Sequence, residues 1–279
     1  MTSVDDIAAA CAHRGLHPDG EPIRTAGGAL LPVRTCDDVP AMVKWVRSPE
    51  EAAGVALLEW WDGDGAVRVL GRWADLVLME RAMDPHGLLE RAVRSPGSDD
   101  AATAVICRVL SRLHAARAAP PPALAPLDGW FADLRAMAAR HGGVPARCAR
   151  VADELLADPG DVGPLHGDCH HSNVLEFGES DWRAVDPKDR FGERAFDHAA
   201  ILVNPDLPHA ADPVRLRRQV TLVSELSGIA AERLIRWAVA RAGLSAAWFS
   251  EDGDDAAARR QIAVAETALR MLPAGAADR

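Results

Sequence analysis

The chain has 279 residues, of which 48% are hydrophobic and 26% are charged, and its formal net charge is −10. This composition is typical of a globular protein with a buried core, and no segment approaches the roughly 20 consecutive apolar residues of a membrane span. The acidic charge argues against a nucleic-acid partner, whose phosphates it would repel, and favours a cationic small molecule.

The first third of the chain predicts mainly strands. Residues 3–14 predict an opening helix with Ser3 as its N-cap, and residues 21–46 predict two or three short strands with a turn at Gly27 and Gly28. A helix is expected to begin at Pro49, since proline is favoured in the first turn. Two apolar stretches, residues 66–70 and 76–80, predict a hairpin.

The remainder of the chain predicts mainly helices, because its apolar residues recur at the helical period. The expected helices span residues 99–118, 128–141, 145–157, 212–226, 230–242 and 255–271. A short hairpin, with strands at residues 174–177 and 182–185, interrupts them. The pattern predicts an α+β protein with a small β-rich lobe over residues 1–83 and a larger, mostly helical lobe over residues 84–279.

The segment "PLHGDCHHSNVL", residues 164–175, carries polar groups between apolar flanks. Its histidines favour a zinc site only weakly, because catalytic zinc sites commonly take two histidines four residues apart on a helix. The spacing His166-x-Asp168-x-x-x-x-Asn173 instead matches a protein-kinase catalytic loop, with Gly167 in place of the usual arginine.

Phosphoryl transfer explains why these residue types occur at this spacing. The protein must position an acceptor hydroxyl and neutralise phosphate charge. Asp168 can accept the hydroxyl proton, while Asn173 and Asp186, which follows the hairpin in "VDPKD", offer the oxygen ligands that Mg²⁺ prefers. The sequence therefore predicts a magnesium-dependent phosphoryl-transfer site.

Upstream residues occur in the order that a kinase needs. Lys44 lies on a predicted strand that follows the Gly27-Gly28 turn, and a predicted helix with Glu50 and Glu51 comes next. Backbone N–H groups of the glycine turn can face phosphate oxygens. The connection "LMERAM" fits an inter-lobe hinge, where backbone groups of Glu80 and Ala82 would pair with adenine.

Taken together, "LHGDCHHSNVL" and "AVDPKDRFGERAFDHAAIL" resemble the aminoglycoside phosphotransferases, in particular the branch of streptomycin 6-kinases and hydroxyurea kinases. The similarity extends over about residues 21–271. It implies a bilobal protein-kinase-like fold and the use of ATP, or alternatively GTP, with Mg²⁺. "KDRFGER" and Cys169 depart from the usual family pattern, which bears on substrate preference.

The resemblance implies roles for individual residues. Asp168 would be the catalytic base, Asn173 and Asp186 would hold Mg²⁺, and Lys44 would contact phosphate. Glu51 would pair with Lys44, although Ser48 and Glu51 also fit a helix capping box. His166 and Asp197 are expected to be structural: His166 would orient the loop backbone and Asp197 would anchor it.

The acceptor site is specified less sharply by the sequence. Carboxylates that bind ammonium or guanidinium groups are available in "SEDGDD", beside Trp248, although a solvated acidic loop explains the same residues. Lys188 is a further candidate and could contact either phosphate or the acceptor, and His170 and His171 are expected to be polar groups of the loop near the acceptor. The expected acceptor-binding residues are Lys188, His171, Trp248, Glu251, Asp252, Asp254 and Asp255.

The sequence thus predicts an ATP-dependent kinase of a small-molecule hydroxyl, with streptomycin or a similar cationic aminoglycoside as the acceptor. Hydroxyurea, another antibiotic or a metabolite is the alternative acceptor, and a nucleotide-binding pseudokinase regulator is the alternative class. Five scattered cysteines without a CxxC pair, and an N-terminus without a signal-peptide pattern, predict a cytoplasmic protein with no membrane association.

Overall fold

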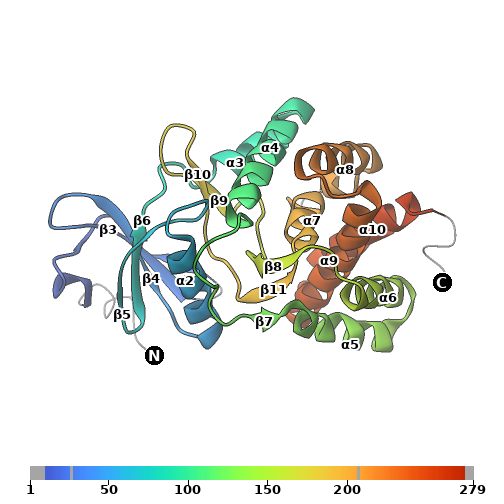
Figure 1. Cartoon of the computed structure of the whole chain (residues 1–279), viewed down its shortest axis with the longest axis horizontal. Coiled ribbons are helices and arrows are strands. Elements are labelled where there is room, and N and C mark those ends of the chain that lie inside the picture. The colour runs from blue at the N-terminus through green and yellow to red at the C-terminus, as the bar shows by residue number, and fades with distance from the viewer. Residues whose placement is uncertain (1–9, 26–27, 206–207, 274–279) are drawn as a thin grey trace.

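The computed structural model describes residues 10–25, 28–205 and 208–273. A β-sheet forms one end of the molecule and a group of helices forms the other, with short strands between them (Figure 1). This arrangement confirms the bilobal protein-kinase-like fold. Most of the expected opening helix, including Ser3, and Gly27 of the expected turn lie outside the described residues.

The sheet has the strand order β1-β3-β4-β6-β5, with β2 paired to β3. Its strands are β1 (His17–Pro18), β2 (Ile23–Thr25), β3 (Gly28–Arg34), β4 (Pro40–Trp45), β5 (Val69–Trp73) and β6 (Leu76–Glu80). Burial alternates along β3 and β4, because successive side chains point to opposite faces. Val43 and Trp45 therefore face a small core, and Lys44 faces the other way.

The first strand of the expected hairpin begins later than predicted, at Val69 rather than at residue 66. Ala66 instead bridges to Ala184 in the other lobe, and Val67 donates its N–H to the Ala184 carbonyl at 2.9 Å. The first two residues of the apolar run, Ala66 and Val67, are thus a buried connection between the lobes, and only its end belongs to β5.

Helix α2 (Pro49–Trp61) joins the sheet to the main core. The Ser48 hydroxyl accepts a hydrogen bond from the Glu51 N–H, which caps the helix as its sequence predicts. Trp61, at the far end of α2, is 1% exposed and packs within the core that the helical lobe also forms.

Most of the second lobe is helical, as predicted. Its helices are α3 (Gly87–Arg94), α4 (Pro96–Leu113), α5 (Phe131–His141), α6 (Gly143–Ala157), α7 (Ala195–Val203), α8 (Pro213–Ser227), α9 (Ala231–Glu251) and α10 (Asp255–Met271). Helix α3 was not predicted. Helix α4 ends at Leu113 instead of residue 118, whereas α9 runs nine residues past its expected end at residue 242.

Short strands lie between the two lobes (Figure 1). One small sheet has the order β7-β11-β8, and the expected hairpin forms a second sheet from β9 and β10. These strands are β7 (Ala125–Pro126), β8 (Val162–Leu165), β9 (Val174–Glu176), β10 (Trp182–Ala184) and β11 (Arg190–Glu193). The loop between β8 and β9 is the segment that carries Asp168.

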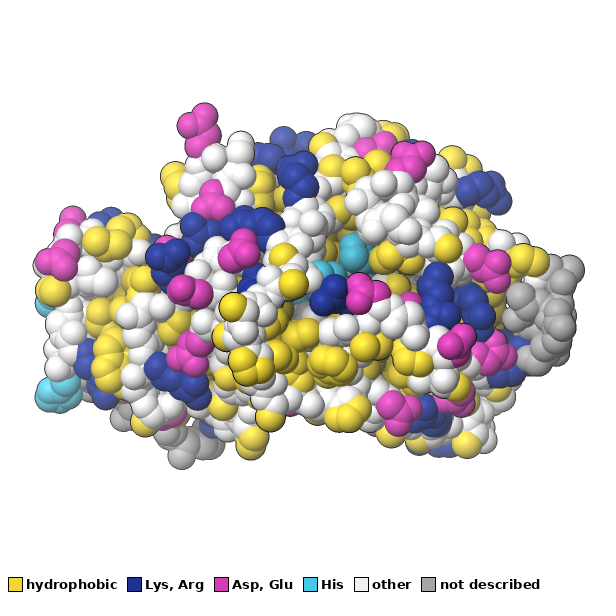
Figure 2. Space-filling view, in the orientation of Figure 1, with side chains coloured by type: hydrophobic (Ala, Val, Ile, Leu, Met, Phe, Trp, Pro, Cys, Tyr) yellow, Lys and Arg dark blue, Asp and Glu magenta, His cyan; other side chains and the backbone are white. Residues whose placement is uncertain are grey.

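The surface is mixed in charge on the face drawn in Figure 2, where acidic and basic side chains are interspersed among apolar ones. The net charge of −10 is therefore not gathered into one acidic field on this face. Within the residues that the structure describes, no helix is long and apolar enough to cross a membrane.

Candidate active site

Asp197, in the first turn of α7, anchors the loop that follows β8. Its two carboxylate oxygens accept the backbone N–H groups of His166 at 2.9 Å and Gly167 at 2.7 Å. Burial alone would raise the pKa of this fully buried carboxyl, but hydrogen bonds from His114 and from the His166 backbone lower it below its ordinary value. The carboxylate therefore stays ionised, and it orients the loop as predicted.

His166 and Gly167 fix the shape of the loop. The His166 ring stacks on Trp61, contacts the Val185 carbonyl through Nε2 at 2.9 Å, and accepts the Asp168 N–H at Nδ1. Gly167 has φ of +82°, and an added Cβ would lie 3.0 Å from the Cβ of Lys188. Glycine thus replaces the arginine of protein kinases where the backbone is left-handed and crowded.

Asp168 projects from this loop with about a third of its side chain exposed. Arg241 donates from Nη2 to Asp168 Oδ1 at 2.7 Å, while Oδ2 lies 3.3 Å from Asn173 Nδ2 and 3.4 Å from His170 Nε2. Burial would raise the pKa of Asp168, but the neighbouring His170 and Arg241 lower it well below its ordinary value. The group is thus a carboxylate at neutral pH, and Oδ2 is its less tightly held oxygen.

The structure brings Asn173 and Asp186 together across the β9–β10 hairpin. Val174 pairs with Ala184 in the ladder, and Val185 donates its N–H to the Asn173 carbonyl at 2.9 Å. Because Asn173 Nδ2 donates to the Asp168 carbonyl at 2.9 Å, the side-chain oxygen of Asn173 faces away and can accept a cation. The donor set of Asn173 and Asp186 therefore consists of oxygens that suit Mg²⁺.

Asp186 is held between two lysines. Lys44 Nζ lies 2.5 Å from Oδ1, and Lys188 Nζ lies 2.8 Å from Oδ2. Burial would raise the pKa of Asp186, but these ammonium groups lower it to about 2. Its φ of +59° is uncommon for a residue other than glycine, and such strain is frequent at functional sites.

Glu51 pairs with Lys44, as the resemblance implies, and does not complete the capping box with Ser48. Its Oε1 lies 3.6 Å from Lys44 Nζ, and its Oε2 accepts the backbone N–H of Arg47 at 2.7 Å. The return bond thus goes to Arg47 and not to Ser48. Gly28, with φ of +159°, lies beside this group, because its Cβ would be 3.8 Å from Glu51 Oε1.

The predicted hinge follows β6. Glu80 already donates its backbone N–H to the Arg68 carbonyl at 3.1 Å, and its side chain pairs with Arg183. The groups that remain for adenine in the predicted role are the Glu80 carbonyl and the backbone of Ala82. Met83 then joins the second lobe through an N–H···O bond of 2.7 Å to Glu176.

His171 is placed differently from the prediction. Its ring is 1% exposed, neither ring nitrogen has a hydrogen-bond partner, and burial lowers its pKa to about 3. It therefore packs as a neutral group inside the lobe and does not face an acceptor. Its neighbour His170, the other histidine that was expected near the acceptor, is the one that approaches Asp168.

The remaining acceptor candidates lie at the end of α9 and the start of α10. Trp248 donates from its indole to Asp133 at 3.0 Å and packs edge-on against Trp130, whose ring tip would be 3.1 Å from a Cβ on Gly167. The four acidic residues are exposed. Asp254 caps α10 by accepting the Ala257 N–H at 2.9 Å, so one of the four has a structural task.

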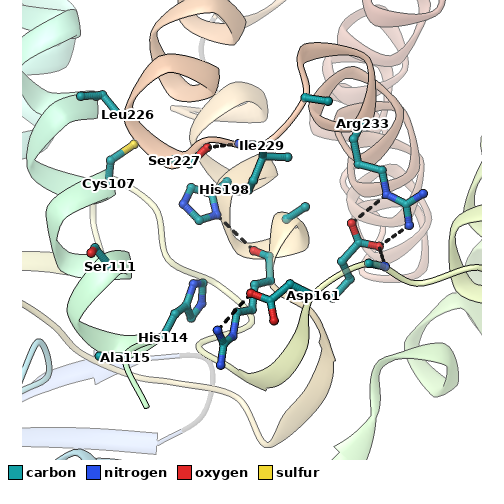
Figure 3. Close-up of a pocket in the computed structure, with 15 residues that line it drawn as sticks. Cys107, Ser111, His114, Ala115, Asp161, His198, Leu226, Ser227, Ile229 and Arg233 are labelled. Atoms are coloured by element: carbon teal, nitrogen blue, oxygen red, sulfur yellow. Dashed lines mark hydrogen bonds and ion pairs between the residues drawn. The ribbon is translucent and has the colours of Figure 1, made fainter.

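Behind Asp197 lies a cavity of about 430 Å³ (Figure 3). His114 and His198 lie one below the other on one side of it, and Arg233 lies on the opposite side. His114 bonds to Asp197 at 2.9 Å, so the cavity touches the anchor of the catalytic loop from behind. No predicted site residue is among those that line it.

Sequence reasoning missed Arg241 and His114. A signal for Arg241 was present, since the mostly apolar stretch "WAVARAGLSAAW" contains one charge, and a buried arginine requires a partner. His114 gave no comparable signal. As to the zinc alternative, no cluster of three metal-ligating His, Cys, Asp or Glu side chains occurs within residues 10–25, 28–205 and 208–273.

Comparison with known families and sequences gives consistent matches. The family model for aminoglycoside/hydroxyurea antibiotic resistance kinases matches residues 13–253. A streptomycin 3''-kinase from Klebsiella pneumoniae is 48% identical over 240 residues, which cover 84% of this chain and 89% of that protein. A hydroxyurea phosphotransferase from Kitasatospora aureofaciens is 33% identical over 276 residues, covering 91% and 75% of the two chains.

Among solved structures, an aminoglycoside phosphotransferase in complex with ADP and hygromycin B superposes with a TM-score of 0.66. The alignment covers 95% of this chain and 99% of that one, at 14% sequence identity. At this identity the likeness supports the fold alone.

Proposed function

We propose that this chain, which belongs to the aminoglycoside/hydroxyurea antibiotic resistance kinase family, transfers the γ-phosphoryl group of ATP to the 3''-hydroxyl of streptomycin. Family membership makes the chain a small-molecule kinase, and its similarity to streptomycin kinases supports phosphorylation of an aminoglycoside, which confers resistance. The observation that carries the choice of position is the 48% identity to a streptomycin 3''-kinase over most of both chains.

Asp168 is the catalytic base in this proposal. It is ionised, partly exposed and held by Arg241 through Oδ1, so that Oδ2 is the oxygen that receives the hydroxyl proton. Its low pKa suits a loose transition state, in which the acceptor hydroxyl needs orientation more than early proton removal.

Asn173 and Asp186 would hold Mg²⁺, which would neutralise charge on the phosphates. Two features support the assignment. The Asn173 amide is oriented with its oxygen free, and Asp186 already attracts two cationic groups. Lys44, steered by Glu51, and Lys188 would release Asp186 to the cation and turn their ammonium groups to the phosphates.

The nucleotide would lie between the sheet and the helical lobe. Gly28, beside Glu51, would approach the phosphates, and Gly27 belongs to the same proposed turn. The backbone at Glu80 and Ala82 would pair with adenine. ATP is the proposed phosphoryl donor and GTP is the alternative. The same backbone contacts would have to distinguish adenine from guanine.

Streptomycin would lie against Trp248, with its cationic groups toward the acidic residues of the α9–α10 connection. The α-helical rise places Glu251 roughly 15 Å along α9 from Arg241, a distance that a polycation of several rings can span. Glu251, Asp252 and Asp255 are the better candidates, because Asp254 is already used as a cap.

The direct test incubates the purified protein with ATP, Mg²⁺ and streptomycin, hydroxyurea or hygromycin B in parallel. We expect ATP-dependent addition of one phosphoryl group to streptomycin, at the 3''-oxygen by NMR. Phosphorylation at the 6-oxygen would keep the reaction but reject the position. Turnover of hydroxyurea alone would reject the acceptor, and ATP binding without consumption with any compound would favour a pseudokinase.

A further inference from the structure

Arg241 occupies an unusual place for a charged side chain. It lies in the middle of α9, where residues 237–244 are all buried, and its side chain is 4% exposed. Its guanidinium lies 4.7 Å from the centre of the Phe196 ring, over the ring face. A charge in such surroundings is costly unless it is paired and hydrogen-bonded.

The partners of Arg241 lie in the catalytic loop. Nη1 donates to the Gly167 carbonyl at 2.8 Å, and Nη2 donates to Asp168 Oδ1 at 2.7 Å. One planar guanidinium thus binds the backbone of Gly167 and the side chain of Asp168, two consecutive residues of the loop. A fork of this kind fixes orientation as well as position, which a single point charge does not.

Arg241 makes the shortest contact with the Asp168 carboxylate. Asp197 holds the N–H side of the loop through His166 and Gly167, but it does not touch the Asp168 carboxylate. The contacts of Asp168 Oδ2 are longer, at 3.3 and 3.4 Å. Arg241 therefore sets the side-chain rotamer of Asp168 and leaves Oδ2 toward the acceptor.

Helix α9 also reaches the proposed acceptor wall. Trp248 follows Arg241 by seven residues, so the two lie on the same face, two turns apart. The helix that orients the carboxylate is thus the helix against which streptomycin would pack.

We propose that Arg241 is the positioning residue of the catalytic carboxylate, a role that rests on the proposed function of Asp168 as base. It holds Asp168 in the rotamer that meets the acceptor hydroxyl, and its effect falls on the chemical step. A displacement of about 1 Å at a reacting group can cost roughly 100-fold in rate.

The test compares Arg241→Met, Arg241→Lys and Arg241→Ala with a control on the same helix. Arg241→Met keeps the packing on Phe196 and should lower kcat by roughly 100-fold, with KM for ATP near the wild-type value. Arg241→Lys keeps the positive charge but not the two-pronged guanidinium, so its kcat should lie between those of the wild type and Arg241→Met. Arg236→Met removes an arginine that pairs with Glu154 away from the site and should leave kcat unchanged.

Chemical rescue separates positioning from a merely structural role. Added guanidinium should raise kcat of Arg241→Ala in a saturable manner, because the ion can enter the vacated space and bond to Asp168. It should not rescue Arg241→Met, whose side chain fills that space, and urea should rescue neither. Wild-type kcat in Arg241→Met, or equal response of both variants to guanidinium and urea, would overturn the proposal.

Basal ATP hydrolysis, measured without any acceptor, distinguishes an error in the proposed role of Arg241 from an error in the proposed function. If streptomycin is not a substrate but hydrolysis still falls in Arg241→Met and recovers with guanidinium in Arg241→Ala, the positioning role stands and the acceptor is wrong. If Asp168→Asn retains full turnover, the assignment of the base is wrong, and the role of Arg241 falls with it.

Discussion

Lys44 Nζ lies 2.5 Å from Asp186 Oδ1, although the two residues are 142 positions apart in the chain. The contact joins strand β4 of the sheet to the segment after β10 in the helical lobe. Each group compensates the charge of the other; the Lys44 side chain is largely withdrawn from water, whereas 41% of the Asp186 side chain is exposed. In the proposed function, the nucleotide and its cation would therefore enter by exchanging partners with this ion pair.

Removal of Mg²⁺ should abolish turnover. EDTA should eliminate phosphorylation and added Mg²⁺ should restore it, whereas a zinc-selective chelator should have no effect, because Asn173 and Asp186 offer only oxygen ligands. Asp186→Asn should raise the Mg²⁺ concentration needed for half-maximal rate. Full turnover in EDTA would reject these two residues as a metal site.

Substitution of Asp168 tests the base. Asp168→Asn keeps the shape of the side chain but removes the proton acceptor, so kcat should fall by roughly 100- to 10,000-fold. KM for ATP should change little, because Asp168 is not expected to contact the nucleotide. Steady-state kinetics at saturating streptomycin measure both values, and a near-normal kcat would show that another group serves as base.

The centre of the site was predictable because its information is local. The spacing of Asp168, Asn173 and Asp186 lies within one loop and one hairpin, and phosphoryl transfer constrains the residue types. Arg241 was not predictable in the same way, because its partner is 73 residues away. His171 was misplaced because adjacent residues in a loop can face opposite directions, and sequence does not show which one is buried.

The ends of two helices were predicted wrongly, and the structure shows why. The helix from residue 230 was expected to end at residue 242, yet α9 continues through Gly243, which serves close packing: an added Cβ would lie 2.5 Å from the Cβ of Cys148. Helix α4 stops early at Leu113, where the Arg117 guanidinium takes up carbonyls that further helical turns would have used. Both effects depend on tertiary contacts.

Gly54 should be intolerant of a side chain. It lies on α2, and a Cβ there would overlap the Pro187 carbonyl, next to Asp186. Gly54→Ala should push α2 from this segment, lower the free energy of unfolding by about 1–3 kcal/mol, and raise KM for ATP. Gly97→Ala is the control, since nothing lies within 4 Å of its added Cβ, and it should not destabilise the protein.

His198 should make stability depend on pH. Burial and the neighbouring His114 lower its pKa from 6.5 to about 4, while its Nδ1 contacts the Arg194 carbonyl at 3.1 Å. In the unfolded chain His198 is protonated as the pH falls below about 6.5, whereas in the folded chain it is protonated only below about pH 4. The stability contribution is therefore complete above pH 6.5 and is lost as pH falls, by about 2 kcal/mol at pH 5.

His198→Asn checks this pH dependence, because asparagine can keep the donor to Arg194 but does not titrate. The free energy of unfolding of the variant, measured by urea titration, should change less between pH 7 and pH 5 than that of the wild type. An equal change in both proteins would assign the loss of stability to other groups.

Salt should separate a polycationic acceptor from a neutral one. Attraction between exposed charges is screened over about 8 Å at physiological ionic strength and about 3 Å at 1 M. Added salt should therefore raise KM for streptomycin more than KM for ATP. The triple variant Glu251→Gln, Asp252→Asn, Asp255→Asn should imitate this effect while Asp254 continues to cap α10.

The matched control removes three exposed acids elsewhere on α8, α9 and α10, by Glu225→Gln, Glu232→Gln and Glu266→Gln. If binding depends on the local contact at the α9–α10 connection, this control keeps a lower KM for streptomycin than the triple variant does. Equal increases in both variants would mean that net charge alone attracts the acceptor. A salt-independent KM in the wild type would contradict a polycationic acceptor and favour a neutral one such as hydroxyurea, with the phosphoryl-transfer machinery unchanged.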